Sequence, residues 1–514
     1  MDTSTDTGTG RPVAEAAAVA EARGQPAAAA LAGDLFGRVP ADDLRPYSPE
    51  TLADLAAGAL EHLSAPRPAG EPDIVLRDIE IESGGRRREL TVVEALNRNV
   101  PFLLDSTLAE IVDQGYEPRL VAHPILAVER DREGRLVRLL GDATAASPSE
   151  ASRESLIHIH LDFVDDPGAR ERLAANLRRT CEDVMVAVAD WPAMRARIEE
   201  AIASYRSGAL PLPADEVAEA LAFLDWIAAG NFTFLGVRAY RFPDGDVAAD
   251  PVAGSGLGLL RNPEVRVLRR GAELVAMTAE VRAFLQRPRA LIIAKANVKS
   301  RVHRRVHLDY VGVKLFSADG RLEGELRVIG LFTSSAYTGS TAEVPYLRRK
   351  VARIVDRAGF DPASYSGRAL LNVLESYPRD ELFQVDEETL YRFAIEIMRL
   401  SERPTVRALA RVDEFDRFVS VLVFIPKDRY DTNVRRRVGE FLAGIYGGRV
   451  SAAYPAYPEG PLSRTHYIVG RYEGSTPEVD RETLESGIRA IVRTWADSLR
   501  DALVETTGGG RARA

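Results

Sequence analysis

The chain has 514 residues, 76 acidic and 67 basic side chains, and a formal net charge of −9. This length exceeds one ordinary domain and predicts two to four domains. The acidic balance argues against a dedicated polyanion binder, so we expect no nucleic-acid partner and no membrane partner. Apolar stretches such as 290–294 and 419–425 are far shorter than the roughly 20 residues that span a bilayer.

Cys181 is the only cysteine, which excludes an intramolecular disulfide, a zinc site built on several thiolates and a cysteine-ligated iron–sulfur cluster. The amino terminus carries no charged-then-apolar signal pattern. Both features predict a cytoplasmic protein.

Residues 1–33 are rich in Ala, Gly and Thr, and their one helix-prone run lacks a large apolar side chain, so we expect a disordered tail. Residues 34–200 are predicted as the first domain. Its expected elements are a strand at 90–96, a helix at 101–113, strands at 120–130 and 156–161, and a helix at 167–188. This order predicts a ferredoxin-like α+β unit.

A middle α+β domain is predicted over 210–400. It opens with a helix capped by Asp215 and ended by Gly230. Expected strands lie at 232–240, 290–295, 306–316 and 324–333, and expected helices at 344–358, 368–377 and 387–400, the last capped by Asp386.

Residues 404–505 repeat the order of the first region and predict a second ferredoxin-like unit. Its expected elements are a strand at 417–426, a helix at 432–446, strands at 450–454 and 466–472, and a long helix from Asp480 with a stripe that reaches Trp495 and Leu499. The glycine-rich end, 506–514, is predicted to be disordered.

Searches for catalytic motifs return weak candidates. The glycines of 254–258 do not form a dinucleotide fingerprint, because Leu259 stands at the offset of its third glycine and no helix follows. We interpret them as a hairpin loop. His158 and His160 share one strand face, and with Asp162 they permit a metal site, as in a metal hydrolase. The favoured alternative is a solvent or interdomain face.

The strongest local charge bias is basic and centres on residues 295–314. It predicts either an anion site or a contact with an acidic domain; the favoured alternative is a solvated edge strand whose charges discourage aggregation. The candidate residues are Arg301, His303, Arg304, Arg305, His307 and Lys314.

The acidic pairs Asp380-Glu381 and Asp386-Glu387 stand at predicted helix starts. Because carboxylates are favoured by the exposed amides and dipole of a helix start, we interpret both pairs as capping groups. No catalytic constellation is predicted.

Six segments in order resemble the bacterial large-subunit, NAD-specific glutamate dehydrogenase family. They are VPFLLDS at 100–106, ESLIHIH at 154–160, AGNFTFLG at 229–236, VHLDYVGVK at 306–314, YPRDELFQ at 377–384, and DRFVS at 416–420 leading to PKDRY at 426–430. The family tends to have an acidic residue and Met before Pro-Phe, where this chain has Asn99 and Val100.

The resemblance implies an amino-terminal regulatory and oligomerisation segment with two ACT-type, ferredoxin-like units flanking a PAS-like domain. The parent reaction would convert L-glutamate, NAD and water into 2-oxoglutarate, ammonium and NADH. The dehydrogenase domain is expected further along or on a separate chain, so we expect no cofactor here and no activity from this chain alone. A homo-oligomer and an amino-acid effector are the implied partners.

ACT-type units commonly bind amino acids, or each other, at the turn between first strand and first helix. The candidate effector residues on that turn are Asn99, Pro101, Phe102, Asp105 and Ser106. The favoured alternative is that Asp105 and Ser106 stabilise the helix start while Phe102 packs inward. A stand-alone amino-acid sensor acting on a separate protein is the alternative function.

Overall fold

The computed structural model divides into two compact units, residues 1–192 with 299–306, and residues 193–298 with 307–514. It describes residues 10–499 and 502, apart from 69, 84, 144–150, 209, 243–248, 266–268, 271–272, 275–288, 318, 415 and 472–474. The predicted disordered end at 506–514 lies outside these residues.

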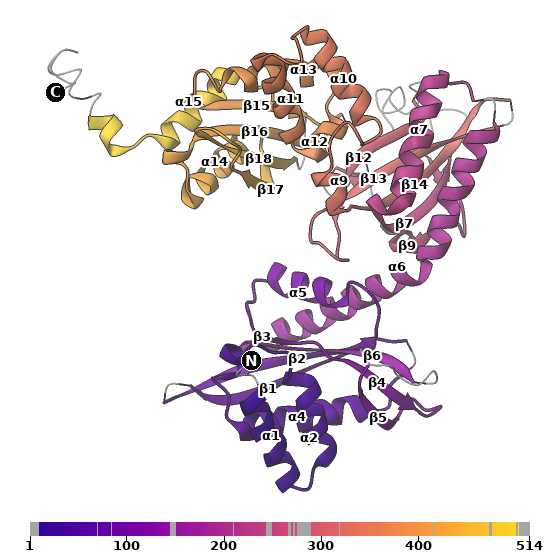
Figure 1. Cartoon of the computed structure of the whole chain (residues 1–514), viewed down its shortest axis with the longest axis vertical. Helices are drawn as coiled ribbons and strands as arrows, with labels where there is room; N and C mark the ends of the chain where they lie inside the picture. The colour runs from indigo at the N-terminus through magenta and orange to yellow at the C-terminus, as the bar shows by residue number, and fades with distance from the viewer. Residues whose placement is uncertain are drawn as a thin grey trace, which may run out of the picture. The chain divides into compact units, whose positions relative to one another are not determined.

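The first unit is a sheet with helices on both faces (Figure 1). Its strand order is β1-β2-β6-β4-β5, and β3 also pairs with β6. The strands are β1 (Asp73–Ser83), β2 (Arg86–Arg98), β3 (Pro118–Ala122), β4 (Ile125–Arg130), β5 (Leu136–Asp142) and β6 (Ser152–Asp162). The helices are α1 (Gly10–Ala22), α2 (Pro26–Phe36), α3 (Ala41–Leu44), α4 (Pro49–Ser64), α5 (Leu103–Asp113) and α6 (Pro167–Ser207), the last continuing past Pro192 into the second unit.

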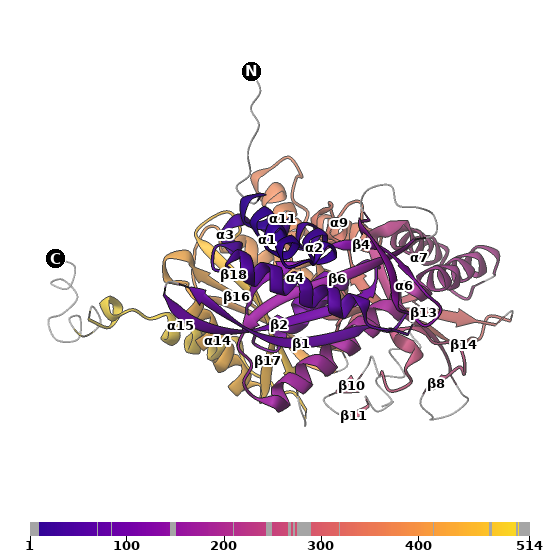
Figure 2. The ribbon, with the colours of Figure 1, turned by 90° about the horizontal axis from the view of Figure 1, so that it is seen from below.

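The expectation of a disordered tail over 1–33 is wrong for the described residues from Gly10 onward. Helices α1, α2 and α4 lie over one face of the sheet, which Figure 2 shows from the helix side. Ala16 and Ala20 of α1 are fully buried. Small side chains let helices approach closely, so an alanine face can be buried without large apolar side chains.

The middle of the second unit is an antiparallel sheet of order β12-β13-β14-β7-β8, with β9 also on β7. The residues of α6 from Met194 onward and helix α7 pack in its core. The elements are α7 (Ala214–Trp226), the π-turn Ile227–Asn231, β7 (Phe232–Arg241), β8 (Asp250–Pro251), β9 (Leu257–Gly258), the 3-10 turn Leu259–Arg261, β10 (Arg269–Arg270), β11 (Glu273–Leu274), β12 (Leu291–Lys299), β13 (His307–Phe316) and β14 (Leu322–Phe332).

Asp215 is not the cap that we predicted. Helix α7 begins at Ala214 with Pro213 as its N-cap residue, so Asp215 lies within the first turn. Gly230 does end the helical segment, with a φ of 97° that favours glycine. The PAS-like description of this region stays a prediction.

Five helices follow the middle sheet: α9 (Ser334–Thr338), α10 (Leu347–Ala358), α11 (Tyr365–Ser376), α12 (Arg379–Gln384) and α13 (Glu387–Arg399). The predicted cap of α13 is confirmed, because the Thr389 amide donates to the Asp386 carboxylate at 2.8 Å. These helices share a core with Leu409, Leu422, Phe424 and Leu462 of the next sheet.

That last sheet has the order β15-β16-β18-β17, with every neighbouring pair antiparallel. Its strands are β15 (Arg407–Val412), β16 (Phe418–Pro426), β17 (Gly448–Ala456) and β18 (Leu462–Arg471), and its helices are α14 (Thr432–Ile445) and α15 (Arg481–Val492), with a 3-10 turn at Lys427–Arg429. Helices α14 and α15 cover the face opposite α10–α13, through Val419, Val421, Tyr467 and Val469.

The two ferredoxin-like units follow the same order. In each, the first strand (β1 or β15) pairs with the second strand (β2 or β16), which leads into helix α5 or α14. That second strand also pairs with the last strand in chain order (β6 or β18). That first strand takes the edge that the final strand takes in a βαββαβ unit. Neither first strand was predicted from the sequence, although the shared topology was. The predicted domains 210–400 and 404–505 lie together in the second unit, except for residues 299–306, which belong to the first.

The predicted long helix from Asp480 is too long, because α15 ends at Val492. Trp495 is 78% exposed and Leu499 is 41% exposed, so the stripe does not continue into the core.

Candidate functional site

The turn between β2 and α5 carries the five predicted effector residues. The Asn99 amide donates to the Arg153 carbonyl at 2.9 Å. Pro101 lies before the helix, because α5 begins at Leu103 with Phe102 as its N-cap residue at a φ of 72°. The Ser106 hydroxyl donates to the Phe102 carbonyl at 2.5 Å. The positive φ of Phe102 is a left-handed conformation that is uncommon for a bulky residue.

The loop 299–306, which connects β12 to β13, belongs to the first unit and lies against this turn. The His303 amide donates to Ser106 Oγ at 2.8 Å, and His303 Nδ1 lies 3.1 Å from Asp105 Oδ2. The His303 ring contacts the Phe102 ring with centroids 4.9 Å apart. His303 itself has a φ of 67°. Through His303, the predicted basic site thus meets the predicted effector turn.

Two arginines of the loop pair with acidic side chains of the same unit. Arg305 Nη2 lies 2.9 Å from Glu110 Oε2 and 3.1 Å from Asp113 Oδ2, both on α5. Arg301 Nη1 lies 3.5 Å from Asp183 Oδ2 on α6. Glu110 is buried, so its pair with Arg305 is less exposed to solvent and salt than a surface ion pair.

Arg304 also belongs to this loop, whereas His307 and Lys314 lie on β13 in the second unit. Lys314 is buried, and burial lowers its pKa to about 8. It lines a cavity of about 540 Å³ together with Lys350, whose pKa burial also lowers to about 8. The six predicted anion-binding residues therefore do not gather at one place.

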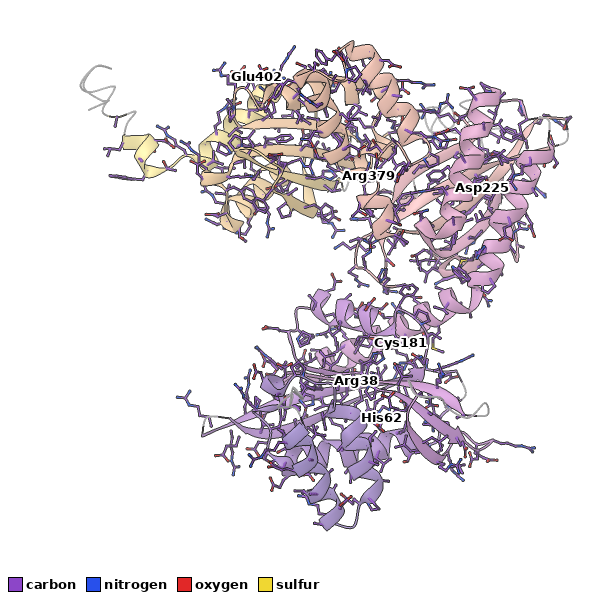
Figure 3. The ribbon with its side chains drawn as sticks, in the orientation of Figure 1. Arg38, His62, Cys181, Asp225, Arg379 and Glu402 are labelled. Carbon is purple, nitrogen blue, oxygen red and sulfur yellow. The ribbon has the colours of Figure 1, made fainter. Side chains whose placement is uncertain are left out.

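His158 and His160 are fully buried rather than facing solvent as we favoured. They belong to a hydrogen-bonded chain: Tyr47 OH to His160 Nδ1 at 2.7 Å, His160 Nε2 to His158 Nε2 at 2.8 Å, and His158 Nδ1 to the carboxylate of Glu94 at 3.0 Å. His62, labelled in Figure 3, contacts the other Glu94 oxygen at 2.8 Å.

Glu94 supplies the carboxylate that ends this hydrogen-bonded chain. Although burial alone would raise the pKa of Glu94, hydrogen bonds from His158 and His62 hold it well below its usual range. Burial lowers the pKa of His160 well below that of a free histidine. The remaining predicted ligand, Asp162, is exposed and pairs with Arg119 at 2.8 Å. Among the described residues, no group of three or more His, Cys, Asp or Glu side chains could hold a metal ion.

A buried charge cluster that was not predicted from the sequence lies in the second unit. Lys295 Nζ on β12 lies 2.7 Å from Asp309 Oδ1 and 3.1 Å from Asp380 Oδ1. The Tyr337 hydroxyl donates to Asp380 at 2.8 Å. Burial raises the pKa of Asp309 to about 6. Although burial alone would lower it, the two carboxylates hold the pKa of Lys295 well above its usual range.

Glu381 extends this cluster to the last sheet. Both its oxygens accept from Arg411, at 2.7 and 2.9 Å, and His466 Nε2 lies 2.8 Å from the Ser420 hydroxyl nearby. A cavity of about 50 Å³, enough for a few water molecules, is lined by Lys295, Asp380, Glu381, Arg417, Tyr454 and His466.

The capping role predicted for Asp380 and Glu381 is wrong. Helix α12 has Pro378 as its N-cap residue, and both carboxylates bind cations of other elements. The sequence did contain part of the evidence for this cluster. Lys295 and Asp309 lie in the basic run, and Asp380 and Glu381 lie in the segment at 377–384. Spacing could not reveal the cluster, because Lys295 and Asp380, for example, lie 85 positions apart in the sequence.

Three family models match the chain. They describe a glutamate dehydrogenase ACT1 domain at residues 31–177, glutamate dehydrogenase helical motif 1 at 344–403, and a glutamate dehydrogenase ACT2 domain at 407–496. The first and third contain the two ferredoxin-like sheets, and the second contains α10 to α13. No described helix is long and apolar enough to cross a membrane.

Three relatives are each called NAD-specific glutamate dehydrogenase. The protein of Halomonas elongata is 33% identical over 92% of this chain, that of Pseudomonas aeruginosa 31% over 85%, and that of Mycobacterium tuberculosis 27% over 90%. The aligned segment is 29%, 27% and 28% of these relatives, so the chain spans less than a third of their length.

Proposed function

Because the chain belongs to the NAD-specific glutamate dehydrogenase family as its ACT1, helical motif 1 and ACT2 region, we propose that it regulates and assembles such an enzyme. The main support for this proposal is that the three matched regions follow one another along one chain and that both ACT regions share one topology. The parent reaction is the NAD-dependent conversion of L-glutamate into 2-oxoglutarate and ammonium. NAD and the catalytic groups belong to a dehydrogenase domain beyond this segment, or on a separate chain.

The proposed effector site is the turn at 99–106. It presents a carboxylate, Asp105, beside the hydroxyl of Ser106, a pair suited to the ammonium group of an amino acid. The loop 299–306 uses the same two side chains through His303. An effector at this turn therefore competes with His303 for them. Because the loop connects β12 to β13, its displacement would reach the middle sheet through the backbone.

We place this protein in the cytoplasm, as its lone buried cysteine supports. We also propose that it forms homo-oligomers through its ACT regions. Light scattering of the purified chain tests this, and a monomer at all concentrations would contradict it.

The function is tested with a chimera in which this chain replaces the matching segment of the Halomonas elongata relative. We expect glutamate-dependent NADH formation by the chimera and none by the 514-residue chain alone. Turnover by the chain alone would refute a purely regulatory role. A chain that binds an amino acid but does not support the chimera favours the stand-alone sensor instead.

The effector site is tested in the same chimera with Asp105→Asn and, as a control, Arg392→Gln, which changes an exposed arginine of α13. The response of the rate to added amino acids should change in the first variant and persist in the second. An unchanged response in Asp105→Asn excludes the turn as the effector site.

A further inference from the structure

Another cavity of the second unit lies between α11, the end of α13 and the last sheet. Its volume is about 570 Å³, which falls within the range of about 300–1,000 Å³ that small-molecule pockets occupy. Phe424 of β16 and Leu462 of β18 contribute to its apolar lining, together with Met398 and Leu400. Phe424, Leu462 and Leu400 are buried, so this apolar lining continues into the shared core of helices and sheet.

Arg464 places a positive charge in this apolar cavity. Its Nη1 donates to the Ser376 carbonyl, the last of α11, at 2.5 Å. A guanidinium has five N–H donors, and no carboxylate of the described residues forms an ion pair with this one. Burial lowers the pKa of Arg464, as expected for a cation with little compensation.

Arg368 of α11 lines the same cavity and likewise has no ion-pair partner among the described residues. Glu459 is the single carboxylate of the lining, and its side chain is exposed. On the neighbouring helix α10, by contrast, Arg348 pairs with Glu219 and Arg353 with Glu387. Two arginines without such partners beside an apolar floor are the pattern of an anion pocket.

We propose that this cavity binds a small amphiphilic organic anion, with the anionic group on Arg464 and Arg368 and the apolar body over Phe424 and Leu462. A planar guanidinium can receive a carboxylate or a phosphate through two parallel hydrogen bonds. Tyr365, 70% exposed, adds an aromatic face to the lining and suits a ring in the ligand. This site is separate from the turn at 99–106, and its test does not depend on the proposed function.

The probes are phenyl phosphate, which has both parts of the expected ligand, benzyl alcohol, which has only the apolar part, and inorganic phosphate, which has only the anion. Ligand-observed NMR and calorimetry on the full chain measure their affinities. Phenyl phosphate should bind at least about ten-fold more tightly than either partial probe, because an anion and an apolar body then act together. Equal affinities of all three probes, or no binding of phenyl phosphate, would overturn the proposal.

Three variants locate the site. Arg464→Gln should weaken phenyl phosphate about ten-fold or more, since it removes the guanidinium and keeps a polar side chain. Ala369→Trp fills the cavity from α11 and should abolish binding while circular dichroism stays unchanged. Arg392→Gln removes an exposed arginine that does not line the cavity and should leave the affinity unchanged. Unchanged binding in both lining variants places the probe elsewhere and refutes the site.

Discussion

The backbone amide of His303 donates a 2.8 Å hydrogen bond to the hydroxyl oxygen of Ser106, a residue 197 positions earlier in the sequence. The same hydroxyl donates to the Phe102 carbonyl. Ser106 thus links the first turn of α5 to the loop 299–306, and it uses both donor and acceptor capacity in doing so.

Replacing Ser106 by Ala removes the acceptor of the His303 amide. The lost hydrogen bond should lower the free energy of opening the loop by about 1 kcal/mol, which is roughly a five-fold gain in amide exchange. Hydrogen exchange followed by mass spectrometry over 299–306 measures this gain. Ser207→Ala, which removes an exposed hydroxyl bonded to the Ala203 carbonyl within α6, serves as the control and should leave the loop unchanged.

The first unit should lose stability as the pH falls below about 6.5. Because burial lowers the pKa of His160 in the folded state, the unfolded chain binds a proton first, and acid favours unfolding. Urea unfolding followed at pH 7.5 and pH 5.5 measures the change. A His160→Gln variant should show a smaller loss between these values than the natural sequence does. An equal loss in both would assign the acid sensitivity to other groups.

Glu94 is the shared acceptor of the buried chain, since His158, His62 and Arg77 all contact its carboxylate. Glu94→Gln should destabilise the first unit by about 3 kcal/mol or more, because the neighbouring donors lose a buried anion. Glu89→Gln changes an exposed glutamate of the same strand and should be nearly neutral. Chemical unfolding of both variants tests the difference; similar stabilities would contradict the structural role of Glu94.

The contribution of Asp309 to stability should fall as the pH rises, which is the opposite of the effect expected for His160. Burial raises its folded-state pKa to about 6, so its contribution to stability is present below the unfolded pKa near 4 and is lost as the pH rises through 6. The stability of Asp309→Asn relative to the natural sequence should therefore increase between pH 4.5 and pH 7.5. Urea unfolding of the second unit at the two values measures this, and a relative stability that falls over this range would contradict the assignment.

Much of the architecture could be predicted from local pattern. Alternating residues at 156–161 predict β6, although His158 and His160 on its polar face are buried as well. The spacing of Leu390, Phe393 and Ala394 predicts α13, because its one buried face imposes a period on the sequence. The two first strands, β1 and β15, were missed. The short strand β15 gains its identity from pairing with β16 rather than from its own alternation.

The sites required more than pattern. Composition and motif spacing by themselves determined the α+β class, the repeated topology and the family resemblance, because these depend on local periodicity and on short strings. Only the tertiary structure decided that His303 meets Asp105, that Lys295 meets Asp380, and that Arg464 borders an apolar cavity. Each of these joins residues from separate elements, and chain folding, not spacing along the sequence, sets which charges become buried together.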